Sequence, residues 1–204
     1  MNSLSDKDKV CFISCSVLKE EIEQLIMQGD LEGKIVFVAK HFHVDYKLLE
    51  DNLRLTIKHV LSNFQGKIIL IYGDLCLGPN NEMKDLVKEY GIIKVDALNC
   101  TDCLLGGKGR IEHIDPNNEM MVLHPGMVGF FTSLKNELSQ ENVDEEIFRN
   151  FFCQLKGIVF LDTLGNSEKA VAEIEKLNTN LKILETKKIG LNALKQVILE
   201  ALQR

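Results

Sequence analysis

Thiol and imidazole side chains are the groups of this chain best suited to chemistry, and four of them follow predicted β-strands. The strands are expected at residues 10–14, 35–39, 68–72 and 92–95, and the side chains that follow them are Cys15, His43, Cys76 and Cys100. The carboxyl ends of parallel strands form the edge where open α/β sheets bind ligands. Thiolate and imidazole are ligands that zinc prefers. The pattern therefore predicts a metal site, most naturally for zinc, while the competing interpretation is that each cysteine is a small buried apolar residue.

The spacing of these four residues also limits what kind of metal site they can form. They are far apart in the chain, so they do not make a zinc-finger motif, and the site depends on the fold bringing them together. With all four residues bound, zinc would be structural, whereas with three it would keep an open position for a substrate thiol or water. An iron–sulfur cluster held mainly by thiolates is the alternative cofactor.

A second cysteine close to Cys100 opens a different interpretation. Cys100 and Cys103 form a CxxC motif, which in a reducing compartment can be a redox pair or half of a metal site. Cys103 is therefore also a candidate substitute for Cys100 as a metal ligand. Cys11 and Cys153 are expected to be core residues, Cys11 in a strand and Cys153 in an apolar helical run.

A glycine-rich segment follows the CxxC motif and combines flexible backbone with two cations. Gly106, Gly107, Lys108 and Arg110 are candidates for binding an anion. The segment is not a Walker motif, and no GxGxxG follows the first strand, so a nucleotide fold is not indicated. A mobile surface loop is the alternative interpretation.

The signatures of acyl transfer and of zinc proteases are missing, because the sequence has no GxSxG and no HExxH. His124 stands beside a Pro-Gly turn, where a solvated histidine is expected. Asp162 follows a later predicted strand and either adds a polar group to a sheet edge or belongs to a helix start near Asn166.

Composition excludes several classes of partner. The 204 residues are 45% hydrophobic and 26% charged, with a net charge of −6. Basic residues are scattered, so nucleic acid and anionic membranes are not expected partners. The polar amino-terminal segment is not a signal peptide, and no apolar run reaches the length of a membrane span. We therefore expect a cytoplasmic protein with reduced cysteines.

Short β-branched runs alternate with amphipathic helical stretches along most of the chain. Further strands are predicted at 120–123, 157–161 and 181–184, and helices at 17–28, 46–61, 82–90, 127–138, 144–155, 167–177 and 191–202. This alternation predicts an α/β fold with a mainly parallel, Rossmann-like sheet covered by helices on both faces. We expect a single domain over residues 1–204, with a helical insertion at about 120–155.

The four edge residues lie in segments that resemble the motifs of a known family. FISCSVLKEEI resembles a strand ending in A-C-G, FHVDYKLLEDNL an L-H-x-x-P motif, and IYGDLCLG a Y-G-x-C-G motif. NCTDCLLGGK resembles a segment with H-D-C or H-C-Y ahead of a glycine, LHPGMVGFF resembles T-P-G-W, and FLDTLGNSEKA resembles the family's carboxyl half. The chain lacks the proline, has one extra residue before Cys76, and has Leu98 or Asn99 where a histidine is usual.

The chain thus resembles a family known as a domain of unknown function, which occurs in methanogenic archaea and in bacteria near genes of corrinoid-dependent methyltransferases. The resemblance implies the same Cys15, His43, Cys76 and Cys100 site. It also implies methyl or thiol-group transfer linked to corrinoid metabolism, as an enzyme or an accessory protein. Alternatives are a non-catalytic partner or metallocofactor chaperone that binds a corrinoid-linked protein, and a thiol redox protein that uses Cys100 and Cys103. The substrate, the oligomeric state and whether the protein is an enzyme stay open at this point.

Overall fold

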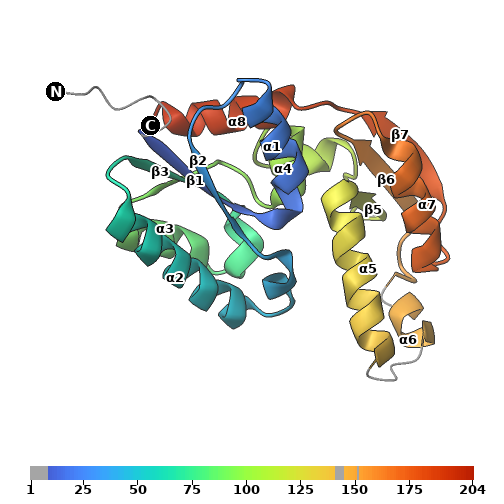
Figure 1. Cartoon of the computed structure of the whole chain (residues 1–204). Helices are drawn as coiled ribbons and strands as arrows, with labels where there is room; N and C mark the ends of the chain where they lie inside the picture. Colours follow the sequence, from blue (N-terminus) through green and yellow to red (C-terminus); the bar gives the residue numbers. More distant parts are fainter. Residues whose placement is uncertain (1–8, 141–144, 151) are drawn as a thin grey trace. The chain divides into compact units, whose positions relative to one another are not determined.

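The structure is a computed structural model that describes residues 9–140, 145–150 and 152–204. The chain forms two compact units (Figure 1). The first unit contains the chain up to Gly109 together with Leu191–Arg204, and the second unit contains Arg110–Gly190. Each unit has its own parallel sheet. Within the described residues, no helix is long and apolar enough to cross a lipid bilayer.

The sheet of the first unit has four parallel strands in the order β2-β1-β3-β4. The strands are β1 (Val10–Cys15), β2 (Lys34–Val38), β3 (Lys67–Ile71) and β4 (Ile93–Lys94). The two central strands, β1 and β3, are almost wholly buried, as expected for strands with helices on both faces. β4 consists of only two residues, so only a short stretch pairs with β3.

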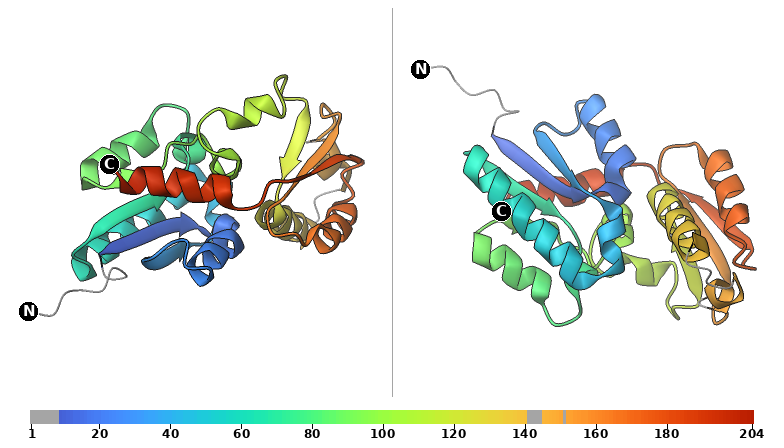
Figure 2. Two further views of the ribbon diagram at one scale, coloured as in Figure 1. Left: turned by 90° about the horizontal axis from the view of Figure 1, so that it is seen from above. Right: turned by 60° about the horizontal axis from the view of Figure 1, so that its bottom comes forward.

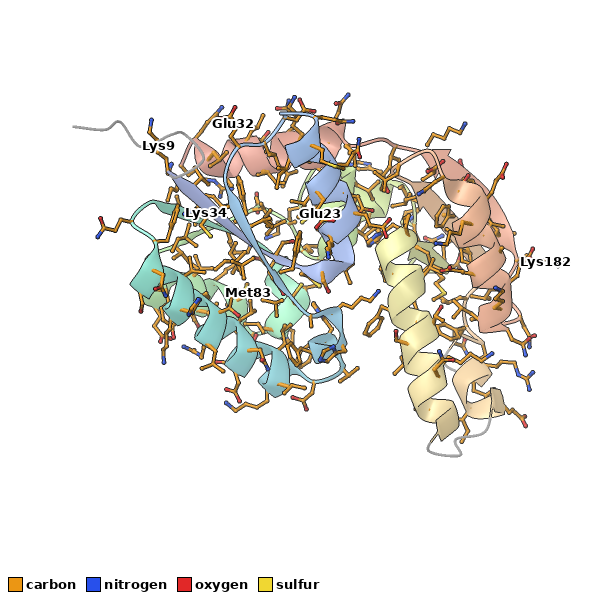
Figure 3. All side chains as sticks on the ribbon, viewed as in Figure 1. Lys9, Glu23, Glu32, Lys34, Met83 and Lys182 are labelled. Carbon is orange, nitrogen blue, oxygen red and sulfur yellow. The ribbon has the colours of Figure 1, made fainter. Side chains whose placement is uncertain are left out.

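Helices cover both faces of this sheet. Helices α1 and α8 lie on one face and α2 and α3 on the other (Figures 1 and 2). Their bounds are α1 (Lys19–Met27), α2 (Tyr46–Asn63), α3 (Glu82–Tyr90) and α8 (Asn192–Leu202). Arg54 of α2 pairs with Glu89 of α3 at 2.7 Å, and Lys195 of α8 pairs with Asp30 beyond α1 at 2.6 Å. Met83 of α3, labelled in Figure 3, is completely buried.

The second unit has a three-stranded parallel sheet in the order β5-β6-β7. Its elements are β5 (Met120–Leu123), α5 (Pro125–Gln140), α6 (Glu145–Asn150), β6 (Gly157–Asp162), α7 (Ser167–Leu177) and β7 (Ile183–Lys188). Its core includes Leu123, Ile158 and Phe160 from the sheet and Val128 and Ile174 from helices.

The α/β class and the parallel pairing predicted from the sequence are confirmed. The arrangement of strands differs from the expectation of one sheet, because β5, β6 and β7 pair with each other and form a separate sheet. The segment expected as a helical insertion at 120–155 forms β5, α5 and α6, and these elements belong to a larger unit that spans 110–190. The last strand begins at Ile183 and ends at Lys188 instead of covering 181–184.

Candidate functional site

The carboxyl edge of the first unit's sheet carries the four residues that the sequence analysis selected. Cys15 is the last residue of β1, and His43 lies in a 3-10 helix (η3, Lys40–Val44) after β2. Cys76 lies in a 3-10 helix (η4, Asp74–Leu77) after β3, and Cys100 begins helix α4 (Cys100–Leu105) after β4. The strand order therefore places them along the edge as His43, Cys15, Cys76 and Cys100. The strand order reverses between β1 and β3, which is where such sheets bind ligands, and Cys15 and Cys76 flank this point.

A side-chain hydrogen bond joins the segment after β1 to the segment after β2. The Lys40 backbone N–H donates to Ser16 Oγ at 2.8 Å. Helix α2 begins directly after η3, and the Asp45 carboxylate caps it by accepting from the Leu48 N–H at 2.8 Å. These bonds hold His43 in a fixed turn beside the end of β1.

The segments that carry Cys76 and Cys100 are joined by backbone hydrogen bonds. The Asp74 N–H donates to the Ala97 carbonyl at 2.8 Å, and the Leu75 N–H donates to the Leu98 carbonyl at 2.9 Å. The two backbones approach so closely at Gly73 that a Cβ atom there would lie 2.2 Å from the Leu98 oxygen. Gly73 is thus required by close packing, and its φ of −82° is ordinary.

Cys15 and His43 form the most direct contact of the site. Cys15 Sγ lies 3.7 Å from His43 Nδ1, and it also accepts the Val17 N–H at 3.4 Å. The Cys15 side chain is buried and His43 is half-buried. Burial lowers the pKa of His43 below its usual value, so the ring is neutral at neutral pH. A neutral imidazole is the form that can bind a metal.

Tyr72 lies beneath this contact and extends the site into the core. Its ring stacks on the His43 ring with the centroids 5.9 Å apart and an angle of 3° between the planes. Its hydroxyl is buried and makes no hydrogen bond of standard geometry. Burial raises the pKa of Tyr72, and the nearby Cys15 thiol adds to the rise.

Burial keeps the thiols of Cys15, Cys76 and Cys103 protonated at neutral pH. Burial raises the pKa of Cys15 to about 12, and the neighbouring Cys100 and Cys76 add to the rise. Burial likewise raises the pKa of Cys76 to about 11, although the Lys94 charge opposes it. Cys103 is completely buried, and its pKa is raised further, mainly by burial and then by Cys100 and Cys76. The charges of Cys100 and Cys76 thus reach both Cys15 and Cys103.

The distances between these groups can be compared with those of a zinc site. A tetrahedral ion with a Zn–S bond of about 2.3 Å and a Zn–N bond of about 2.0 Å holds the two ligand atoms about 3.5 Å apart. The 3.7 Å between Cys15 Sγ and His43 Nδ1 fits this value. In the described part of the chain, however, no three His, Cys, Asp or Glu side chains are gathered closely enough to hold an ion as they stand. A third ligand therefore requires Cys76 or Cys100 to rotate toward the pair.

The CxxC motif lies on helix α4, which the sequence analysis did not predict as an element. Asn99 caps the helix by accepting from the Asp102 N–H at 2.9 Å. The buried Asp102 carboxylate in turn accepts from the Leu98 N–H at 3.1 Å and the Gly109 N–H at 3.0 Å. The middle of the CxxC motif thus holds the glycine-rich loop against the helix.

The glycine-rich loop does not offer its amides to a ligand. The N–H groups of Gly106, Gly107, Lys108 and Gly109 all donate to acceptors within the first unit. The backbone amides of Gly106 and Gly107 are already hydrogen-bonded within the chain, so they do not form the anion cradle that the sequence suggested. Lys108 keeps an exposed side chain, while the exposed Arg110 belongs to the second unit.

Several other sequence-based expectations concern residues outside this site. His124 is completely buried at the end of β5, so the expectation of a solvated turn histidine is wrong. Asp162 is buried at the end of β6, where it accepts the Gly165 N–H at 2.7 Å and does not cap helix α7. Cys11 is buried as expected, but Cys153 is exposed and is not a core residue.

The fold and the site together define an α/β protein whose first unit carries thiol and imidazole side chains at the carboxyl edge of a parallel sheet. Residues 37–198 match a family described as a protein of unknown function (DUF1638), and the chain belongs to that family. The match includes His43, Cys76 and Cys100 and begins after Cys15. Searches of curated proteins and of solved structures found no match.

Proposed function

We propose that this protein binds zinc through Cys15, His43, Cys76 and Cys100, with Cys103 as the alternative to Cys100. The observation that carries the proposal is the 3.7 Å contact between Cys15 Sγ and His43 Nδ1. The thiols of Cys76 and Cys100 lie near enough to interact electrostatically with Cys15. Zinc binding would displace the protons of these buried thiols, and the charge of the ion would stabilise the resulting thiolates.

The burial of Cys103 bears on the alternative of a redox function. A reactive redox cysteine has a lowered pKa and an electropositive surrounding. Cys103, one half of the CxxC motif, is instead completely buried with a strongly raised pKa. Cys103 is therefore unsuited to be the attacking thiol of a redox pair, a role that would fall to the half-buried Cys100.

The chemistry of a bound ion depends on the number of ligands that the protein supplies. If three side chains bind the ion, the open position can accept a substrate thiol, and zinc then favours its thiolate form. This outcome fits methyl or thiol-group transfer linked to corrinoid metabolism. If four bind, the ion is structural, and the edge would serve a non-catalytic partner or metallocofactor chaperone.

The experiment that tests the proposal is metal analysis of reduced protein purified without chelator. We expect about one zinc per chain in the wild type and severe loss of zinc in His43→Ala and Cys76→Ser. Cys153→Ser is the matched control, since Cys153 is exposed and lies in the second unit. Loss of zinc in Cys103→Ser, but not in Cys100→Ser, would assign the fourth ligand to Cys103.

Two results would overturn the proposal. One is a wild-type protein that binds zinc no more tightly than its Cys15, His43 and Cys76 variants. The other is a brown protein containing iron and sulfide, which would show that the thiols hold an iron–sulfur cluster.

A further inference from the structure

Three lysines converge on a single carboxylate beside the thiols. Lys94 Nζ lies 2.7 Å from Asp74 Oδ1, and Lys108 Nζ lies 3.3 Å from Asp74 Oδ2. Lys84 Nζ, from helix α3, lies 3.8 Å from the same Oδ2 atom. One negative charge thus faces three positive charges, which leaves this group of four side chains with a net charge of +2.

The three lysines differ in what they can still bind. Lys94 is nearly buried and also donates to the Val95 carbonyl, so it serves to anchor Asp74. The Lys84 and Lys108 side chains are about half exposed, at 51% and 46%. Lys84 also donates to Asn81 Oδ1 at 2.9 Å. Since an ammonium group has three donors, both exposed lysines keep N–H capacity for an anion.

This cationic group adjoins the thiol cluster. Asp74 and Cys76 lie in the same short helix, η4, and Lys94 comes from the strand that precedes Cys100. An anion bound by the exposed lysines would therefore lie next to the thiols.

We propose that Lys84 and Lys108, positioned by Asp74 and Lys94, bind the phosphate or carboxylate group of a small-molecule ligand whose other end reaches the thiol cluster. The anion site itself rests on the lysine geometry alone, and only the orientation toward the thiols rests on the proposed function. Neither the glycine amides nor Arg110 takes part. A purely structural ion-pair network would bind no ligand, so anion binding distinguishes the two roles.

The test is calorimetric titration of the reduced full-length protein with inorganic phosphate and, separately, with succinate at low salt. We expect saturable binding of at least one anion, and the stronger of the two identifies the group that the ligand carries. Lys84→Met and Lys108→Met should each weaken binding about tenfold, because each removes a charge-assisted hydrogen bond. Lys88→Met removes the same charge from the same helix and should change binding less than twofold.

A fourth variant gives a change in the opposite direction. Asp74→Asn keeps the shape of the side chain and an Oδ1 atom that can accept from Lys94, so the anchor of the group stays in place. It removes the negative charge that competes for Lys84 and Lys108, so phosphate or succinate should bind more tightly. Failure of the wild type to bind either anion, or an equal loss of affinity in Lys88→Met and Lys84→Met, would overturn the proposal. Zinc content measured on the same samples distinguishes a failure of the anion site from a failure of the zinc site, since we expect the lysine variants to retain zinc.

Discussion

Burial raises the pKa of the Cys15 thiol to about 12 and that of the Cys76 thiol to about 11. At neutral pH they are therefore almost entirely protonated, and neither is a ready nucleophile. Only a cation that replaces their protons can make them strong ligands. The chemistry available to these residues thus depends on pH and on metal, and both dependences can be measured.

The first prediction concerns the stability of the metal-free protein in alkali. The pKa of Cys15 is raised on folding, so the folded state holds its proton more tightly than the unfolded state. The resulting stability is complete below pH 9 and is lost as the pH rises from 9 toward 12. At pH 10 the loss due to Cys15 should be about 1.4 kcal/mol. Urea unfolding of the wild type should show this loss between pH 8 and 10, whereas Cys15→Ala should show a flatter dependence. Parallel curves for the two proteins would contradict it.

The second prediction concerns the pH dependence of zinc binding. Cys15 and Cys76 must each release a proton, whereas His43 is already neutral above its lowered pKa. Between pH 7 and 9 the apparent association constant should thus rise about a hundredfold or more per pH unit. Competition with a chelator of known affinity measures this slope. A slope near zero would mean that these thiols do not bind the ion.

At the scale of the elements, the segments that follow the strands determine where the site residues lie. The segments after β3 and β4 are joined by two backbone hydrogen bonds, and Gly73 lies where they touch. This junction sets the distance between Cys76 and Cys100, so the site depends on a residue that carries no functional group.

The third prediction tests this junction. Gly73→Ala should destabilise the protein by about 2–3 kcal/mol, because its Cβ would collide with backbone atoms that cannot move aside. It should also reduce zinc affinity by separating the two segments. Gly91→Ala is the control: Gly91 has a φ of +63° but open space around it, so it should cost only about 1 kcal/mol and leave zinc binding intact. Urea unfolding and chelator competition measure both effects, and equal zinc affinities in the two variants would contradict the role of the junction.

The local pattern was sufficient to predict these elements and the edge residues they carry. The strands before Cys15, His43 and Cys76 are runs of apolar residues, and helices α3 and α7 lie where their periodicity placed them. Pairing between distant strands, in contrast, has no local signature, so the division into two sheets was not foreseen. The contacts of Tyr72 and Asp74 were missed for the same reason, although a lysine at position 94 within an apolar strand was a signal of a buried acidic partner.

At the scale of the whole molecule, the first unit is assembled from two separate parts of the chain. Helix α8 contributes Leu194, Val197, Ile198 and Ala201 to its buried core. A Cβ atom at Gly106 would lie 3.7 Å from Ala193 Cβ, so the two segments of the first unit that flank residues 110–190 in the sequence lie close together. All the residues proposed to bind zinc or anions belong to the first unit.

The fourth prediction follows from this connectivity. Replacing residues 110–190 by a short Gly-Ser linker should give a folded protein that retains zinc binding, because both parts of the first unit are present and their ends are close. Truncation after Gly190 should instead unfold the first unit by removing α8 from its core. Circular dichroism, thermal unfolding and zinc analysis of the two proteins test this. A truncated protein as stable as the linked one would show that α8 is dispensable.

The interrupted path of the first unit also has a consequence for biosynthesis. During translation, β1 to α4 emerge first, but the helix that completes their core follows only after the 81 residues Arg110–Gly190. At about 5–20 residues per second, that interval lasts on the order of ten seconds. The nascent chain therefore holds its reduced cysteines in an incomplete core for that time, and this is when the cell's metal supply or oxidants have the freest access to them.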